Sequence, residues 1–386
     1  MLTKGVKFTN FKTKKKSLLI KKKLISLLKS KNEILNSLSQ NYKYNFTKKI
    51  LLKYKRNKNY RVIGMGGSSL GTQTIYDFLK YKIKKKFVFS DNLQVNLNKD
   101  KKKYTNLIVS KSGNTIETIV NANIFIKKKD RNIFITENKN SYLLNLAKKL
   151  KSDIIHHNNY IGGRYSVLSE VGMLPAELMG LKASNFRQLN NLIKNKQFIN
   201  SLISNVSSTL YFIKKKKFNS IIINYDERSE NLFNWYQQLI AESLGKKKKG
   251  LLPIVSNMPK DNHSTMQLYL DGFKNNFFTF FYVNEKNSEK IKNNTIAASQ
   301  YYLKNKSLSQ VTLAQKKATE NVFKNKNIPF RSFEINKRDE KTLGELFCFF
   351  ILETILIGQS MNLNPYDQPA VELIKVETKK LLIKNS

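Results

Sequence analysis

The chain has 386 residues, a hydrophobic content of 40% and a formal net charge of +43 at neutral pH. This length exceeds what one hydrophobic core usually supports, so two domains with a cleft between them are expected. The one cysteine, Cys348, stands in an apolar run and predicts a buried thiol, which excludes a disulfide framework and a cysteine-based zinc site. The three histidines are too scattered to indicate a metal site.

The positive charge alone would point to a nucleic-acid or membrane partner. The lysines, however, occur in short runs between apolar segments, and Asn, Ile and Lys are frequent throughout, as strong A+T bias in a coding sequence would produce. We therefore expect neither partner. No stretch reaches about 18 uninterrupted apolar residues, and the first 32 residues lack the apolar core of a secretory signal. The cytoplasm is the default localisation.

Residues 1–45 predict a basic helical arm that precedes the first domain. The apolar residues of the arm repeat at helical spacing, so they are expected to form its buried side. These residues are Leu18, Leu19, Leu24, Ile25, Leu27 and Leu28.

From about residue 59, short β-rich apolar runs alternate with helical stretches, which is typical of parallel sheets covered on both faces. The spacing predicts two α/β domains in tandem, at residues 46–185 and 186–386. The predicted strands lie at 61–65, 87–90, 107–110, 132–136, 153–156, 219–224, 251–255, 277–283 and 329–335. The predicted helices lie at 69–82, 115–126, 141–150, 229–244, 263–271, 307–325, 340–361 and 369–383.

A glycine-rich turn, Gly64-Met65-Gly66-Gly67-Ser68-Ser69-Leu70-Gly71, follows the first predicted strand. With Asp91 after the next strand, it is similar to a dinucleotide-binding fingerprint. Ser69 stands where the third glycine of that fingerprint would fall, so the turn fits a compact polar ligand better. A nucleotide-dependent dehydrogenase remains an alternative.

The segment Ser110-Lys111-Ser112-Gly113-Asn114-Thr115 follows a predicted strand and opens a predicted helix. Backbone N–H groups converge on an anion at such a place, and the three hydroxyls could donate to phosphate oxygens. A phosphate cradle is one interpretation. An ordinary helix cap is the other.

Two further segments carry groups suited to acid–base chemistry. Gly162-Gly163-Arg164-Tyr165-Ser166 places an arginine after two residues without side chains, so its guanidinium could reach an oxyanion or form a structural salt bridge. Glu242 ends a predicted helix, and His263 lies 21 residues further on. A carboxylate and an imidazole in one pocket suit proton transfer, although each can also be structural.

The motif Tyr366-Asp367-Gln368-Pro369-Ala370-Val371-Glu372-Leu373-Ile374-Lys375 completes a set of four with the segments that begin at Gly64, Ser110 and Gly162. The four motifs in this order resemble phosphoglucose isomerase, from about residue 60 to the C-terminus. The resemblance implies an α/β fold of two sugar-isomerase (SIS) domains, each a parallel sheet flanked by helices, with the active site at their interface. It also implies interconversion of glucose 6-phosphate and fructose 6-phosphate.

The resemblance assigns four catalytic roles by position. Glu242 matches the base that moves a proton between C2 and C1 through a cis-enediol. His263 matches the histidine that opens the ring, and Lys375 the lysine that assists it. Arg164 matches the arginine that stabilises the enediolate. The positions that match substrate and phosphate contacts are Gly67, Ser68, Ser110, Lys111, Ser112, Thr115, Gly163, Gln238 and Gln368.

The resemblance implies no metal and no organic cofactor, a sugar phosphate as ligand, and a homodimer. Three features depart from the family: a short N-terminus, the net charge, and Glu170 where a small residue is more usual. Two alternatives remain besides the dehydrogenase. One is an isomerase that also accepts mannose 6-phosphate. The other is a non-catalytic sugar-phosphate regulator, although Glu242, His263 and Lys375 are all retained.

Overall fold

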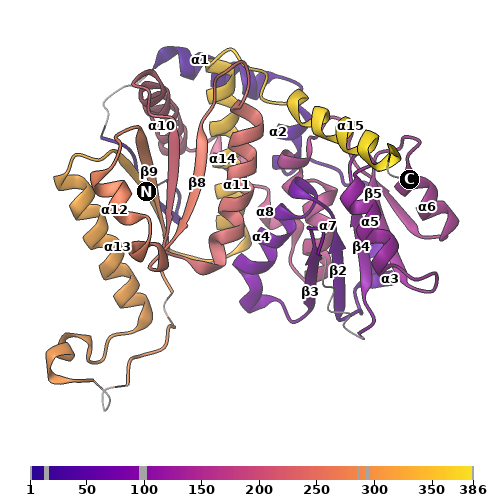
Figure 1. Ribbon diagram of the computed structural model, residues 1–386, viewed down its shortest axis with the longest axis horizontal. Helices are drawn as coiled ribbons and strands as arrows, with labels where there is room; N and C mark the ends of the chain where they lie inside the picture. The colour runs from indigo at the N-terminus through magenta and orange to yellow at the C-terminus, as the bar shows by residue number, and fades with distance from the viewer. Residues whose placement is uncertain (1, 13–16, 95–101, 286, 293–295, 385–386) are drawn as a thin grey trace.

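The computed structural model describes residues 2–12, 17–94, 102–285, 287–292 and 296–384. Two five-stranded sheets lie side by side, with α4 (Leu70–Leu79) and α11 (Glu230–Leu244) packed against each other between them (Figure 1). This arrangement confirms the predicted fold class of parallel sheets flanked by helices.

The first sheet has the strand order β3-β2-β4-β5-β6, and every neighbouring pair is parallel. Its strands are β2 (Asn59–Ile63), β3 (Lys86–Ser90), β4 (Thr105–Val109), β5 (Arg131–Thr136) and β6 (Asp153–His156). All five residues of β4 are buried, because helices cover both faces of the sheet. The predicted strands are confirmed, with starts shifted by one or two residues in most of them.

The second sheet has the order β1-β10-β9-β7-β8. Its strands are β1 (Val6–Thr9), β7 (Asn219–Asn224), β8 (Leu252–Asn257), β9 (Asn276–Val283) and β10 (Phe330–Ile335). All pairs are parallel except β1 with β10, where Val6 lies opposite Ile335. The second series of predicted strands is therefore also confirmed.

Helices join and cover the sheets. In the first part of the chain they are α1 (Leu18–Lys29), α2 (Glu33–Leu38), α3 (Lys48–Tyr54), α5 (Ile116–Phe125), α6 (Tyr142–Lys149), α7 (Glu170–Met179), α8 (Ala183–Phe186) and α9 (Leu189–Leu192). In the second part they are α10 (Lys196–Lys214), α12 (Met266–Asp271), α13 (Leu308–Asn325), α14 (Glu340–Ser360) and α15 (Pro369–Lys384). Short 3₁₀ turns include η1 (Gly66–Ser68), η3 (Gly163–Leu168) and η5 (Lys260–His263).

The N-terminal segment corrects the expectation of a purely helical arm. Residues 6–9 form β1, an edge strand of the second sheet. In α1, Leu24 and Leu27 are buried as predicted, but Leu18, Leu19 and Ile25 are exposed. The helix packs only one narrow stripe against α10 and α14, so apolar residues outside that stripe face solvent. The boundaries near residues 45 and 185 stay predictions.

We call the part of the chain around the first sheet the first unit and the part around the second sheet the second unit. Helix α14 runs through the core of the second unit. Of the described residues, it forms the one helix long and apolar enough to cross a membrane, and 94% of its apolar window is buried inside the protein. Cys348 lies in the middle of this helix, where burial raises the pKa of its thiol to about 12. The predicted buried thiol is confirmed.

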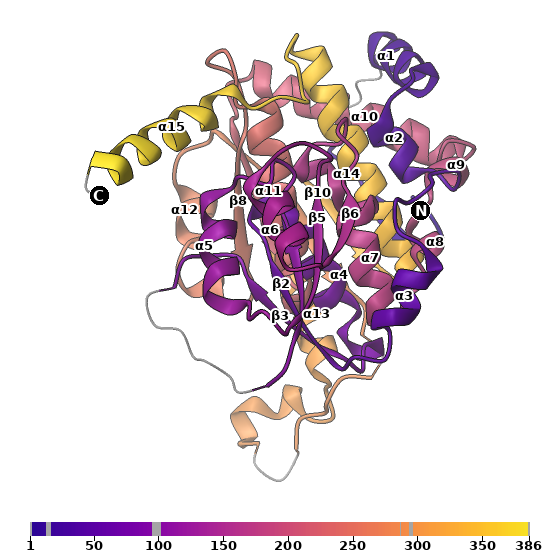
Figure 2. The same ribbon diagram turned by 90° about the vertical axis from the view of Figure 1, so that its right-hand side faces the viewer.

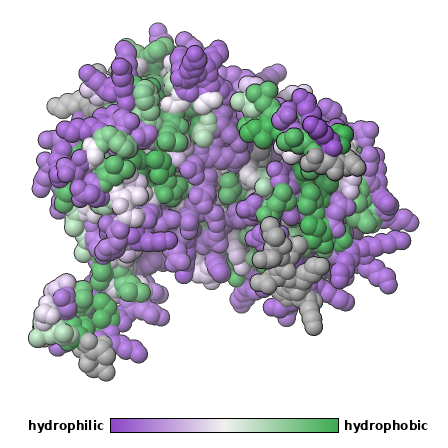
Figure 3. All heavy atoms as spheres, in the orientation of Figure 1, coloured by the Kyte–Doolittle hydropathy of each residue, from purple (hydrophilic) through white to green (hydrophobic). Residues whose placement is uncertain are grey.

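Helix α15 leaves the body of the molecule as a separate rod (Figures 1 and 2). None of its described residues is buried. Its apolar side chains, among them Leu373, Ile374 and Leu382, are exposed. Apolar surface is visible over this helix at the upper right of Figure 3.

Candidate active site

The turn after β2 packs directly on the turn that contains Gly162 and Gly163. A Cβ atom on Gly67 would lie 2.2 Å from the carbonyl carbon of Gly163 and 2.5 Å from the backbone nitrogen of Arg164. Ser166 Oγ donates to the Gly163 carbonyl at 2.7 Å and so fixes the second turn. Glycine at position 67 is therefore required by close backbone approach, as the predicted compact turn implies.

The segment Ser110–Thr115 curls at the carboxyl end of β4, directly before α5. Gly113 has a φ of +66° and its Cβ would clash with Ser141 Oγ at 2.2 Å, so the turn depends on glycine. The hydroxyls of Ser110 and Thr115 are 2.9 Å apart, and the Thr115 side chain does not cap α5. Two hydroxyls of the segment therefore lie together directly before the N-terminus of α5.

Lys111 turns away from the cradle. Its Nζ donates to the Asn159 carbonyl at 2.8 Å and lies 3.4 Å from Glu137 Oε1. The lysine thereby ties the cradle to the loop after β6, which leads to Arg164.

Helix α11 presents three polar groups to the site from one face. Trp235, Gln238 and Glu242 follow each other at spacings of three and four residues, so they lie along one side of the helix. Trp235 Nε1 donates to the Arg164 carbonyl at 3.0 Å, and Gln238 Nε2 donates to Glu242 Oε1 at 2.7 Å. The helix dipole disfavours a carboxylate in the last turn, so Glu242 depends on a nearby cation.

Arg164 supplies that cation. Its side chain is 1% exposed, and each of its five N–H groups donates to an acceptor. Nη1 donates to Glu242 Oε2 at 3.1 Å and to Gln368 Oε1 at 2.7 Å. Nη2 donates to the carbonyls of Pro365 and Asp367, at 2.7 and 3.0 Å. The arginine therefore joins the first unit, α11 and the C-terminal segment at one point.

Two residues that carried no predicted role complete this framework. Arg164 Nε donates to Ser243 Oγ at 2.8 Å, and the Tyr165 hydroxyl lies 2.8 Å from the same oxygen. The Tyr165 hydroxyl also donates to the Pro365 carbonyl at 2.9 Å. Both side chains are fully buried. The sequence signal was present, because Tyr165 follows Arg164 and Ser243 follows Glu242, but only the fold shows that the two pairs meet.

A cavity of about 820 Å³ opens beside Glu242. Its wall includes the turn Gly245–Lys249, the segment Asp367–Val371 and Glu242 itself. The side chain of Glu242 is 28% exposed, so the carboxylate is accessible while its partner Arg164 is not. A polar ligand could enter here and meet a base held by a buried guanidinium.

The structure separates His263 from Glu242 within one chain. Glu242 precedes β8, and His263 ends η5 after that strand. A six-residue strand spans about 20 Å, so the two side chains lie at opposite ends of β8. His263 is exposed and makes no side-chain hydrogen bond or ion pair within the described residues.

Lys375 also lies outside the cluster. It stands two helical turns after Gln368 on α15, and its Nζ pairs with Glu372 Oε1 at 2.6 Å. Gln368, in contrast, is held against Arg164. The C-terminal motif is therefore divided between a fixed first half and an exposed helix.

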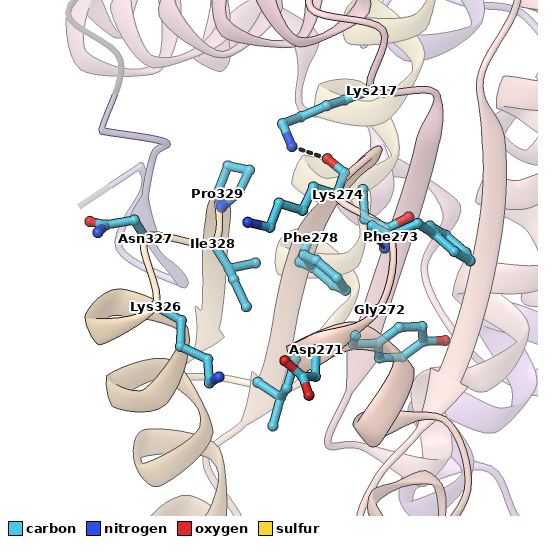
Figure 4. Close-up of a pocket in the computed structure, with 13 residues that line it drawn as sticks. Lys217, Asp271, Gly272, Phe273, Lys274, Phe278, Lys326, Asn327, Ile328 and Pro329 are labelled. Carbon is cyan, nitrogen blue, oxygen red and sulfur yellow. Dashed lines mark hydrogen bonds between the residues drawn. The ribbon is translucent and has the colours of Figure 1, made fainter.

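Another cavity, of about 400 Å³, contains none of the predicted site residues (Figure 4). It lies at the amino ends of β9 and β10, where Lys217, Lys274 and Lys326 surround Phe278 and Ile328. Lys217 Nζ donates to the Lys274 carbonyl there. The cavity holds no arrangement of base and fixed cation comparable with that at Glu242.

Glu170, which departs from the family's usual small residue, is accommodated in the fold by the N-terminal segment. The Tyr42 hydroxyl donates to its Oε1 at 2.9 Å, and the backbone N–H of Asn45 donates to the same atom at 3.3 Å. Burial raises the pKa of the Glu170 carboxyl. These bonds connect the segment before α3 to α7.

Comparison with known proteins agrees with this geometry. The phosphoglucose isomerase family model matches residues 52–385. The chain is 33% identical over 349 residues to a glucose-6-phosphate isomerase of Methanocaldococcus jannaschii, covering 83% of this chain and 84% of that protein. It is 30% identical over 347 residues to the glucose-6-phosphate isomerase of Campylobacter jejuni, covering 84% and 85%.

Two solved structures share the fold. A hypothetical protein from Thermus thermophilus aligns with a TM-score of 0.80 and 22% identity, over 94% of each chain. A glucose-6-phosphate isomerase from Chlamydia trachomatis aligns with a TM-score of 0.69 and 17% identity, over 92% of this chain and 74% of that one. At these identities the two structures bear on fold alone. With the family model matched over most of its length, this chain belongs to the phosphoglucose isomerase family.

Proposed function

We propose that the cluster around Glu242 interconverts D-glucose 6-phosphate and D-fructose 6-phosphate by acid–base catalysis. The observation that carries the proposal is the contact between Glu242 and the buried Arg164, at 3.1 Å. Glu242 is the base: it removes the proton from C2 of the open-chain aldose and returns it to C1 of the cis-enediol, while a proton moves between the two oxygens. The reverse sequence converts the ketose.

Arg164 is the electrostatic partner in this proposal. Five donated hydrogen bonds fix its guanidinium, so little reorganisation is needed when negative charge develops on the enediolate. An enediolate oxygen would exchange for Gln368 Oε1 at Nη1. The hydroxyls of Ser110, Ser112 and Thr115 would hold the phosphate, with Gly67, Ser68 and Gly163 as backbone contacts and Gln238 orienting the base.

We also propose that the working enzyme is a homodimer in the cytoplasm. The separation of His263 from its own Glu242 supports this, because a second copy could place its His263 beside that carboxylate and open the sugar ring. Lys375 would assist the same step. The exposed α15, which carries it, would then have to approach the site.

The test is a coupled assay that converts fructose 6-phosphate to glucose 6-phosphate, run with the wild type, Glu242→Gln and Glu227→Gln. Glu227 is an exposed glutamate before α11 and serves as the matched control. We expect Glu242→Gln to lower turnover by about 10²–10⁴ while substrate binding persists. Equal activity in the two variants would refute the role of Glu242.

The same assay separates the alternatives. Activity with mannose 6-phosphate would show the broader specificity. A wild type that is inactive, although fructose 6-phosphate raises its melting temperature, would identify a sugar-phosphate regulator instead.

A further inference from the structure

The five strands of the first sheet are parallel, so the segments that lead into them all lie along one border of the sheet, at the amino-terminal ends of the strands. Every one of these segments carries exposed cations. These are Lys55, Arg56 and Lys58 before β2, Lys80, Lys82, Lys84 and Lys86 before β3, Lys102 and Lys103 before β4, Lys127, Lys128, Lys129 and Arg131 at β5, and Lys148, Lys149 and Lys151 before β6. We call this surface the basic edge.

Few carboxylates offset this charge. In the described part of these segments they are Asp130 and Asp153. Asp153 is already engaged with Lys53 at 2.7 Å and with the Tyr54 hydroxyl at 2.6 Å. Asp130 accepts from the backbone N–H of Lys127 at 2.9 Å. From outside these segments, Glu340 pairs with Lys82 at 2.7 Å. The cations still outnumber the carboxylates several-fold, so the basic edge carries a large positive charge.

The loops of the same sheet at the opposite edge, where the phosphate cradle and Arg164 lie, are less basic; the lysines beside the site, Lys246–Lys249, come from the second unit and line the cavity at Glu242. In the described residues that directly follow these strands, the cations are Lys111, Lys139 and Arg164. Two of them are paired, Lys111 with Glu137 and Arg164 with Glu242. The charge at the basic edge is therefore not explained by attraction of substrate to the site, which lies about 17 Å away along a five-residue strand.

The basic edge is hollowed rather than flat. A groove of about 760 Å³ is lined by six cations, Lys58, Lys103, Lys127–Lys129 and Arg131, and by one carboxylate, Asp130; the rest of its lining is Asn57, Asn59, Tyr104 and Thr105. Lysine binds phosphate as a point charge, without the planar geometry that reads a base. A membrane surface would meet a flatter face with apolar side chains that insert into it.

We propose that the basic edge binds the phosphate backbone of single-stranded nucleic acid, without regard to base sequence, and RNA is the probe in the experiment that tests it. The five strands at about 4.8 Å spacing spread the cations over roughly 20 Å, enough for several consecutive phosphates. The composition argued against a nucleic-acid partner, because coding bias explains scattered lysines. It does not explain the contrast between the two edges of one sheet, which only the parallel topology reveals.

The experiment measures binding of a labelled oligouridylate to the full chain by fluorescence anisotropy, at about 50 and 200 mM salt. One variant replaces Lys127, Lys128 and Lys129 with Gln. The control replaces Lys214, Lys215 and Lys216, an exposed lysine run on the second unit, and so changes the net charge equally. Isomerase activity should persist in both variants, since neither run contacts the site.

We expect the Lys127–Lys129 variant to bind about tenfold more weakly at the lower salt and to lower the salt slope by about 2, as loss of three single-strand phosphate contacts predicts. The control should retain its affinity. Equal losses in the two variants would mean attraction by net charge alone and would overturn the proposal. An absence of RNA binding would also overturn the proposal. Binding of anionic phospholipid vesicles that depends on Lys127–Lys129, without binding of RNA, would identify a membrane surface as the partner instead.

Discussion

Arg164 Nε donates to Ser243 Oγ at 2.8 Å in a contact that no solvent reaches. Ser243 is the neighbour of Glu242, so one buried hydroxyl fixes the guanidinium on the side away from the base while Nη1 meets the carboxylate. The relative orientation of the two charged groups thus depends on a residue that is not itself expected to touch substrate.

Replacing Ser243 with Ala should therefore impair catalysis by misorienting Arg164. We expect kcat to fall by at least about tenfold with a smaller change in KM, because a developing charge is stabilised less well. The free energy of unfolding should fall by about 1–3 kcal/mol, since Arg164 Nε loses its acceptor. Steady-state kinetics and a denaturation curve measure both effects. Ser207→Ala, which removes a buried hydroxyl that donates to the Ile203 carbonyl in α10, should leave kcat unchanged.

Mixing two inactive variants tests the shared site. Glu242→Gln and His263→Ala chains, mixed and allowed to exchange subunits, should recover about a quarter of wild-type activity, because half of the dimers are mixed and each has one intact site. The measurement is the coupled assay before and after exchange. Activity that stays at the level of the separate variants would place the two residues in the same site of one chain, or exclude His263 from the site.

Gly67→Ala should destabilise the protein, whereas Gly163→Ala should not. The added methyl group would lie 2.2 Å from the Gly163 carbonyl carbon, so we expect a loss of about 1–3 kcal/mol in stability and a lower melting temperature. Gly163→Ala adds the same methyl group where the nearest neighbouring atom is 3.8 Å away, and should preserve the melting temperature. Equal melting temperatures for the two variants would contradict the close packing of these turns.

His157 should make the protein sensitive to acid. The side chain is 3% exposed, and burial lowers the pKa of its imidazole from 6.5 to about 4. The folded state therefore keeps His157 neutral while the unfolded state takes up a proton, so stability present above pH 6.5 is lost as the pH falls toward 4. At about pH 5 the loss is about 2 kcal/mol.

Urea denaturation near pH 7.5 and at about pH 5 measures this effect. His157→Gln should remove most of the difference between the two pH values, whereas His156→Gln, at the exposed neighbouring position, should retain it. The same acid sensitivity in all three proteins would assign the effect to other groups.

Local sequence predicted the described strands other than β1 and most of the longer helices, but it missed α7 and the long helix α10. Strands buried on both faces appear as continuous apolar runs, and glycine turns with hydroxyl or arginine residues follow β2, β4 and β6, so both can be recognised locally. Predictions were wrong where burial depends on distant partners. The exposure of Leu18, Leu19 and Ile25, and the pairing of β1 with β10, follow from the narrow contact of the N-terminal segment with the second unit.

How the motifs combine, in contrast, depends on the folded chain. Packing brings Ser243 and Tyr165 together around Arg164, places His263 a strand length from its own Glu242, and leaves Lys375 on an exposed helix. The parallel topology also gathers five lysine-bearing segments at one edge of a sheet. None of these relations has a local signal, because each joins residues far apart in the chain through packing that only the complete fold defines.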